Sequence, residues 1–166
     1  MMRYLRNAVG NWKDDGQVKD QLVRILRREL GDGTGLIYGM GHAVYTLSDP
    51  RAEILKQFSR RLAEKRGMVD QLDLIESVER LAPQVFQEVR GSDKPICANV
   101  DLYSGFVYRL LGIPTDLYTA IFASARMPGW CAHRMEECCA DDPRIIRPAY
   151  KTVCKRVPYV PLADRS

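Results

Sequence analysis

The sequence has 166 residues, a formal net charge of +4 at neutral pH and a hydrophobic share of 46%. This length is enough to bury a substantial core, and it fits one domain or a part of a larger protein. No run of about 18 apolar residues is present and the start lacks the pattern of a signal peptide, so we expect a cytoplasmic chain without a membrane span. The charge is modest and suits anionic small molecules as well as nucleic acid.

The cysteines predict neither disulfides nor a metal site. They number five and show no paired spacing, so free buried thiols are expected in a cytoplasmic chain. The nearest approach to a metal-binding motif is a cluster of four residues: Cys131, His133, Cys138 and Cys139. A Cys-x-His pair followed by adjacent cysteines is not a recognised zinc spacing. We therefore expect no bound metal.

Apolar residues recur at helical spacing over residues 17–30, and a glycine-rich turn follows at 31–35. Residues 36–38 have the apolar character of a short strand, but so few residues do not make a sheet. A second helix is predicted from Arg51 to Gly67. Its core stripe is predicted to consist of four apolar side chains: Ile54, Leu55, Phe58 and Leu62.

The helical pattern continues over residues 69–89, where Pro83 is predicted to break or kink the segment into two helices. Residues 94–98 should be extended, because the residue before a proline avoids the α region. A later helix should be kinked at Pro128. The remaining helices are predicted at 102–111, 117–127 and 130–139. The total of five to seven helices with almost no strand predicts an all-α fold.

The loop that leads into the helix at Arg51 is the feature most suggestive of function. Two glycines precede and flank His42, so main-chain N–H groups and the imidazole can converge on one bound oxygen. Asp49 is predicted to cap a helix with Pro50 at its first position. This places Arg51, whose guanidinium fork suits a carboxylate, at the start of that helix. Taken alone, the same residues also fit a glycine-rich connector with one packed histidine.

The string GMGHAVYTLSDPRAEILK from Gly39 to Lys56 resembles the GxGHxVY…DPRA signature of citrate synthases and 2-methylcitrate synthases. Residues 99–105 resemble the second signature of the family. Three further pairs resemble its third and fourth signatures: Ala125-Arg126, Gly129-Trp130 and Arg147-Pro148. The resemblance implies an all-α, citrate-synthase-like fold. Residues 1–113 would form the small mobile domain, and residues 114–166 the C-terminal helices and tail of the large domain.

The resemblance implies condensation of an acyl-CoA with oxaloacetate and hydrolysis of the citryl-CoA intermediate, as in the tricarboxylic acid cycle. Asp101 would be the base that removes a proton from the acyl methyl group. From the residues alone, the favoured interpretation of Asp101 is an ordinary residue at a helix N-terminus, where a carboxylate is favoured. His42 would donate a hydrogen bond to the ketone oxygen. Arg51, Arg126 and Arg147 would hold the carboxylates of oxaloacetate, the last reaching in from a second subunit of a homodimer.

Acetyl-CoA or propionyl-CoA would be a substrate, and no cofactor is expected. The resemblance implies CoA contacts at six residues: Leu36, Gly39, Gly41, Ala43, Lys94 and Asn99. Thr46 stands where relatives often carry a basic residue for a CoA phosphate. Acyl specificity and stereochemistry stay open.

The family's other catalytic histidine, in a GGxHGGA-type motif, has no counterpart in this sequence. We therefore expect a fragment that is inactive alone and that dimerises or self-associates. Two alternatives are a truncated, non-catalytic module that binds CoA or a partner helix, and a basic helical nucleic-acid binder. The second predicts binding that weakens steeply with salt.

Overall fold

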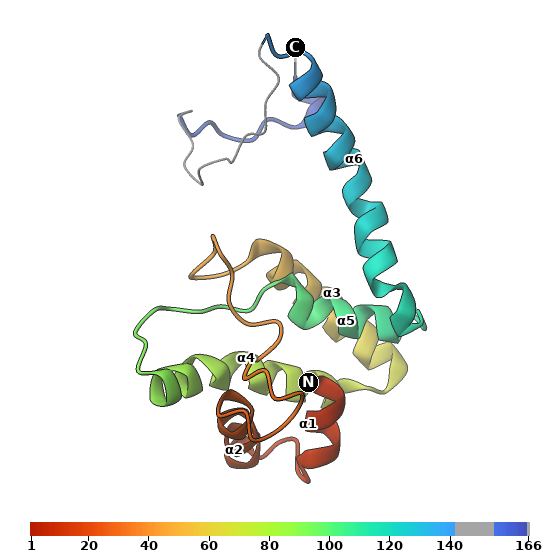
Figure 1. Ribbon diagram of the computed structural model, residues 1–166. Helices are drawn as coiled ribbons and strands as arrows, with labels where there is room; N and C mark the ends of the chain where they lie inside the picture. Colours follow the sequence, from red (N-terminus) through yellow and green to blue (C-terminus); the bar gives the residue numbers. More distant parts are fainter. Residues whose placement is uncertain (142–154, 166) are drawn as a thin grey trace. The chain divides into compact units, whose positions relative to one another are not determined.

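The computed structural model describes residues 1–141 and 155–165 of the chain (Figure 1). All regular structure in these residues is helical, which confirms the all-α prediction. The α-helices are α1 (Met2–Ala8), α2 (Asp15–Leu26), α3 (Pro50–Arg66), α4 (Val69–Arg90), α5 (Val100–Leu110) and α6 (Tyr118–Cys138). Short 3-10 helices lie at Thr115–Leu117 and Leu162–Asp164. The chain divides into two compact units, Met1–Arg126 and Met127–Ser166, which we describe separately.

Helices α1 to α5 form the core of the first unit. Helix α4 packs against α2, while α3 and α5 lie side by side (Figure 1). Buried side chains from all five helices join in a single hydrophobic cluster, which includes Leu5, Leu22, Leu72, Val78 and Tyr103. This cluster is the scaffold that holds the loops before α3 and α5 in place.

Helix α2 begins where its sequence supplies a cap, but it ends earlier than its sequence predicts. The Asp14 side chain accepts hydrogen bonds from the N–H groups of Gly16 and Gln17, which satisfies two of the free donors at the helix start. The helix ends at Leu26, four residues before the predicted end at Leu30. The chain turns there because Arg28 adopts a left-handed conformation, with φ of 65°.

Helix α3 buries only part of the predicted stripe, since Leu55 and Leu62 pack against the core while Ile54 and Phe58 are more than half exposed. Its buried residues are Ala52, Ser59 and Ala63, while Ile54 is 56% exposed and Phe58 is 51% exposed. The prediction was wrong for Ile54 and Phe58 because it selected the largest apolar side chains. Small side chains on the buried face allow close packing of this helix against its neighbours, and that requirement decides which face turns inward.

Helix α4 is continuous through Pro83, so the predicted division into two helices was wrong. A proline inside a helix removes one backbone hydrogen bond, but its fixed φ is compatible with helical geometry. Val78, Leu81 and Val85 are buried on both sides of the proline, and this packing favours one continuous helix. Helix α6 likewise continues through Pro128. The predicted helix starting after Pro128 is therefore part of α6.

The start of α6 is fixed against α5 within the first unit. The Tyr118 hydroxyl donates to the Gly105 carbonyl oxygen at 3.3 Å, and its ring packs edge-on against Tyr108 at 5.0 Å between centroids. Leu117 is 48% exposed and Phe122 is 43% exposed. The 3-10 helix and the beginning of α6 therefore present apolar side chains to solvent.

In the second unit, the structure describes residues 127–141 and 155–165. The Arg165 Nε donates to the Val160 carbonyl oxygen at 2.9 Å and lies over the Tyr159 ring. Cys131 and Cys138 of α6 are exposed, as is Cys139 directly after the helix. The expectation of buried thiols was thus wrong for these residues, whereas Cys97 of the first unit is buried. None of the described helices has the length and hydropathy needed to cross a membrane.

Candidate active site

The histidine loop, residues 39–45, approaches α5 so closely that Gly39 cannot be replaced without displacement. A Cβ atom at Gly39 would lie 2.7 Å from the Leu102 Cα, and its φ is 88°. Gly41 has a similar φ of 87°, but a Cβ there would meet no neighbour within 4 Å. Close approach therefore requires glycine at position 39, and backbone conformation favours it at position 41.

Backbone hydrogen bonds tie the histidine loop to the extended segment before α5. The Asn99 N–H donates to the Gly39 carbonyl oxygen, and the Gly41 N–H donates to the Cys97 carbonyl oxygen, both at 2.8 Å. Met40 and Ala98 form an antiparallel bridge. The Asn99 side-chain amide also donates to the Gly41 carbonyl oxygen at 2.8 Å. The loop and the N-terminus of α5 therefore form one connected structure.

The His42 imidazole is oriented by the backbone that follows it. Its Nδ1 accepts hydrogen bonds from the N–H groups of Val44 at 3.0 Å and Tyr45 at 3.1 Å. The ring also packs against the Tyr45 ring, with centroids 4.8 Å apart. Because Nδ1 is the acceptor, the proton of the neutral ring is assigned to Nε2. His42 is thus held with Nε2 as a hydrogen-bond donor.

Asp49 and Arg51 form a bidentate ion pair at the start of α3. The Arg51 Nε donates to Asp49 Oδ1 at 3.0 Å, and Nη2 donates to Oδ2 at 2.8 Å. Asp49 also accepts from the Arg51 backbone N–H, which confirms its predicted capping role. The hydrogen bond from the Arg51 side chain lowers the pKa of Asp49, and the same bond raises the pKa of Arg51.

His42 and Arg51 meet through two nitrogen atoms that are both donors. The Arg51 Nη2 lies 3.4 Å from the His42 Nε2. With Nε2 protonated, neither nitrogen accepts the other's hydrogen. Two N–H groups therefore converge on a place suited to an acceptor oxygen, which is what a carboxylate or a ketone supplies.

Asp101 lies in the first turn of α5 and is exposed. Its N–H donates to the Asn99 Oδ1 at 2.9 Å, so Asn99 caps this helix. The negative charge of Asp101 contributes to the raised pKa of Arg51, after the dominant hydrogen bond from Asp49. Asp101 therefore acts electrostatically on Arg51, although the two residues are far apart in sequence.

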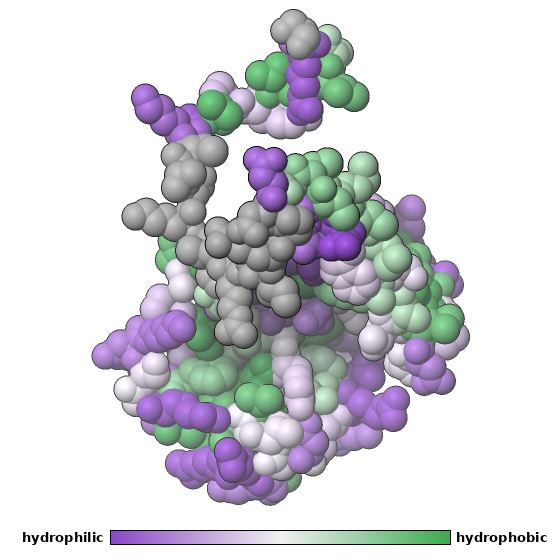
Figure 2. Space-filling model, turned by 45° about the horizontal axis from the view of Figure 1, so that its top comes forward, coloured by the Kyte–Doolittle hydropathy of each residue, from purple (hydrophilic) through white to green (hydrophobic). Residues whose placement is uncertain are grey.

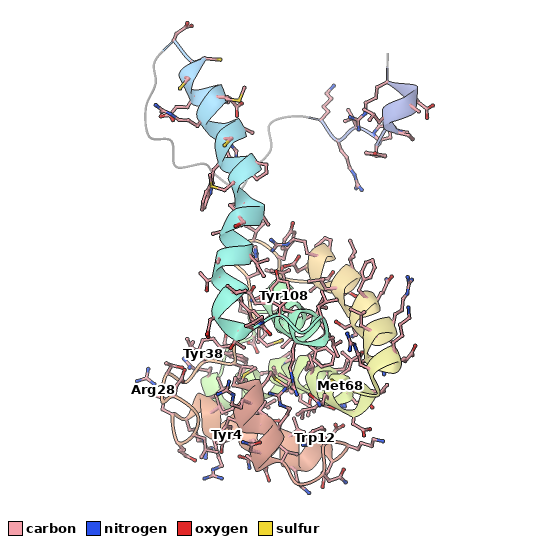
Figure 3. The ribbon with its side chains drawn as sticks, turned by 90° about the vertical axis from the view of Figure 1, so that its right-hand side faces the viewer. Tyr4, Trp12, Arg28, Tyr38, Met68 and Tyr108 are labelled. Atoms are coloured by element: carbon pink, nitrogen blue, oxygen red, sulfur yellow. The ribbon has the colours of Figure 1, made fainter. Side chains whose placement is uncertain are left out.

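The predicted CoA-contact residues fall into two groups. Gly39, Gly41 and Asn99 belong to the connected structure described above, with Ala43 exposed on the loop. Leu36 is 51% exposed and lines a cavity of about 550 Å³ together with Tyr4 and Tyr38. Figure 3 shows these two tyrosines, from α1 and from the loop after α2.

Lys94 is exposed, and its N–H donates to the Ser92 hydroxyl at 3.3 Å. Among the contacts of the described residues, none joins it to the histidine loop.

Two of the predicted oxaloacetate ligands are not brought to this place by the described contacts. The Arg126 guanidinium is exposed and lies over the Phe122 ring at 5.5 Å from its centroid. Arg147 lies outside the described residues. Within the described ranges, no three His, Cys, Asp or Glu side chains are grouped so as to hold a metal ion.

A carboxylate in the loop after α2 was missed by the sequence interpretation. Asp32 accepts hydrogen bonds from the Thr34 hydroxyl at 2.6 Å and from the Tyr38 hydroxyl at 2.6 Å. These bonds, that of Thr34 first, lower the pKa of Asp32 to about 2. The Asp-Gly-Thr sequence is typical of an aspartate that accepts from the backbone two residues later, and this signal predicts the turn.

The fold and the site define an all-helical protein with a histidine, an arginine and a carboxylate near the N-termini of two neighbouring helices. Residues 4–149 match the family model described as citrate synthase, C-terminal domain. The chain therefore belongs to the citrate synthase family.

Citrate synthases of several organisms are similar in sequence to this chain. The chain is 38% identical to citrate synthase from Deinococcus radiodurans over 135 residues, 81% of this chain and 34% of that protein. It is 39% identical to citrate synthase from Haloferax volcanii over 167 residues, 99% of this chain and 39% of that protein. The chain thus spans well under half the length of these relatives.

Solved structures show the same similarity. The crystal structure of citrate synthase from Pyrobaculum aerophilum matches with a TM-score of 0.60 and 30% identity, over 96% of this chain and 38% of that one. Citrate synthase from Thermoplasma acidophilum matches with a TM-score of 0.57 and 29% identity, over 97% of this chain and 44% of that one. The second was solved as a ternary complex with carboxymethyl coenzyme A and oxaloacetate.

Proposed function

We propose that this chain supplies substrate-binding and catalytic residues for the condensation of an acyl-CoA with oxaloacetate. The observation that carries the proposal is the convergence of the His42 Nε2 and the Arg51 Nη2, which lie 3.4 Å apart. A keto acid offers a ketone oxygen next to a carboxylate, so it can accept from both donors at once. His42 polarises the ketone and stabilises the alkoxide that forms there, while Arg51 holds the carboxylate.

Asp101 is the base in this proposal. It removes a proton from the methyl or methylene carbon next to the thioester carbonyl, and the resulting enol attacks the ketone carbon. Its position in the first turn of α5 supports the role, because the helix N-terminus favours negative charge there. Arg126 and Arg147 complete the grip on oxaloacetate, and the enzyme acts as a homodimer in the cytoplasm.

The acyl-CoA is bound by the loop and the adjoining segments, in the residues Leu36, Gly39, Gly41, Ala43, Lys94 and Asn99. The ternary complex of the Thermoplasma relative supports this pair of substrates. Either acetyl-CoA or propionyl-CoA fits the proposal, the latter giving 2-methylcitrate. The remaining catalytic groups belong to portions of the relatives that this chain does not match, so the isolated chain is expected to be inactive.

A chimera tests the proposal. The matching region of the Haloferax volcanii relative would be replaced by this chain, and thiol release from acetyl-CoA and propionyl-CoA would be followed with oxaloacetate. Replacing Asp101 with Asn should lower kcat by about 10²–10⁴, because an amide does not accept the proton. Oxaloacetate binding should stay nearly unchanged. A D101N chimera that turns over like its parent would contradict the assignment.

The two alternative functions predict different outcomes. A non-catalytic module would bind CoA in a titration of the isolated chain, yet its chimera would not turn over. A nucleic-acid binder needs a continuous basic surface. Several cations are instead paired with carboxylates, including Lys19 with Glu88, Arg60 with Asp73 and Arg80 with Asp15. Figure 2 shows hydrophilic side chains interspersed with hydrophobic ones on the face that it draws.

A further inference from the structure

Asp49 is the only charged side chain in the described residues that is buried, with 1% of its surface exposed. Burial of a carboxylate is costly unless ion pairs and hydrogen bonds compensate for the lost water. Asp49 receives four hydrogen bonds. Its Oδ1 accepts from the Arg51 N–H and Nε, and its Oδ2 accepts from the Arg51 Nη2 and from the Val100 N–H at 3.2 Å.

These donors come from two different helices. Arg51 lies in the first turn of α3, and Val100 is the first residue of α5. The first N–H groups of a helix have no acceptor within the helix. One carboxylate therefore satisfies free donors at two helix N-termini, although sequence analysis assigned it only to the first.

We propose that Asp49 is a positioning residue that aligns the catalytic groups on these two helices. It fixes the Arg51 guanidinium so that Nη2 faces the His42 Nε2, and it holds the start of α5, where Asp101 lies. The Arg51 side chain is 47% exposed, so without this bidentate partner it would sample many rotamers. The meaning of the alignment for catalysis depends on the proposed function, whereas the alignment itself does not.

The arrangement leaves Arg51 free to bind a ligand. Its Nε and one hydrogen of Nη2 are used by Asp49, and the guanidinium has five donors in total. The N–H donors that Asp49 does not use remain available to bind an incoming carboxylate. A small misplacement of such a group is expensive in catalysis, since a shift of about 1 Å can cost about 10²-fold in rate.

The test uses the chain itself, labelled with ¹⁵N, and needs no substrate. In the wild type, hydrogen exchange at the Val100 N–H and at the Arg51 Nε–H should be slowed by at least about tenfold relative to unprotected groups, because both donate to the buried carboxylate. If either exchanges at the unprotected rate, the proposal is overturned. This measurement remains decisive even if every Asp49 variant fails to fold.

The variant Asp49→Ser tests whether Asp49 holds the Arg51 side chain and the Val100 N–H. Serine still caps α3 but lacks a second oxygen. We expect faster exchange at the Val100 N–H and the Arg51 Nε–H and a changed ¹⁵N shift at the His42 Nε2. The Asp101 N–H, capped by Asn99, and the His42 Nδ1, bonded to two backbone amides, should be unchanged. Glu53→Gln removes an exposed carboxylate from the same turn of α3 and is the matched control, with no expected change.

A general loss of structure gives a different pattern. It would move both His42 nitrogens and expose the Asp101 N–H, and this result in D49S would contradict a positioning role. Unchanged Arg51 exchange in D49S would also contradict it. None of these signals depends on oxaloacetate, so failure of the chimera to turn over would count against the proposed function alone.

Discussion

At the scale of single residues, the site depends on positions where the backbone passes so close to a neighbouring segment that only glycine fits. Gly39 is the clearest case, because the space a Cβ would need is occupied by the backbone of α5. Gly41 adopts almost the same φ without a neighbour. The two glycines therefore separate the cost of a steric clash from the cost of left-handed backbone.

Replacing Gly39 with Ala should destabilise the chain more than replacing Gly41 with Ala. The first change adds overpacking of about 1–3 kcal/mol to a conformational cost of about 1–2 kcal/mol, and the second adds only the conformational cost. Urea unfolding followed by circular dichroism measures the difference. Equal midpoints for the two variants would show that the loop moves away from Leu102 at no cost.

The lowered pKa of Asp32 predicts how the stability of the chain changes at low pH. Its pKa falls from an ordinary value of 3.8 to about 2 in the folded chain. Because the folded pKa is the lower one, its contribution to stability is fully present above about pH 4 and is lost as the pH falls towards 2. The wild type should have a higher melting temperature than D32N at pH 5, and the gap should close near pH 2.

Other carboxylates also titrate in this acidic range. The pKa values of Asp15 and Asp49 are lowered by arginine partners, so the wild type loses stability there for several reasons. The comparison with D32N at each pH removes these shared contributions. A gap that stayed constant from pH 5 to pH 2 would exclude the linkage.

At the scale of elements, helix α3 shows what sequence pattern can and cannot predict. Its start and end follow from Asp49, Pro50 and Gly67, and the structure confirms these signals. Its buried face does not follow, because hydrophobic periodicity weighs side-chain size and ignores how closely a neighbouring helix approaches. The same limit explains α4, where a local rule for Pro83 was outweighed by tertiary packing on both sides.

The buried face of α3 can be tested by substitution. Ala63→Leu places a large side chain at a fully buried position and should cost about 1–3 kcal/mol. Phe58→Ala removes a larger apolar group from a half-exposed position and should cost less than about 1 kcal/mol. Denaturant unfolding measures both. A larger cost for F58A than for A63L would mean that Phe58, and not Ala63, lies on the buried face of the helix.

Much of the candidate site was also predictable at this scale, but its connections were not. The glycines, His42, Arg51 and Asp101 stand out as sequence signals. The bonds from Asn99 to the histidine loop and from Val100 to Asp49 depend on two segments meeting that are about fifty residues apart. No local pattern encodes such a pairing, so the positioning role of Asp49 emerges only from the structure.

At the scale of the whole molecule, the chain matches well under half of its relatives' length, and this bears on the surface it exposes. Leu117, in the 3-10 helix before α6, is 48% exposed, Phe122 of α6 is 43% exposed, and no residue of α6 is buried. Exposed apolar side chains of this kind favour association, because burial removes them from water.

We therefore predict that the purified 166-residue chain forms oligomers and does not catalyse condensation. Light scattering should give a mass above the 18.9 kDa monomer, and the double variant Leu117→Asp, Phe122→Asp should shift the population towards monomer. Gln57→Asp, an exposed polar position on α3, is the control for added negative charge and should leave the mass unchanged. A thiol-release assay with acetyl-CoA and oxaloacetate should detect no turnover in any of these proteins. A monomeric wild type would contradict the role of this apolar surface, and robust turnover would contradict the prediction that the chain is inactive without the histidine of the GGxHGGA-type motif.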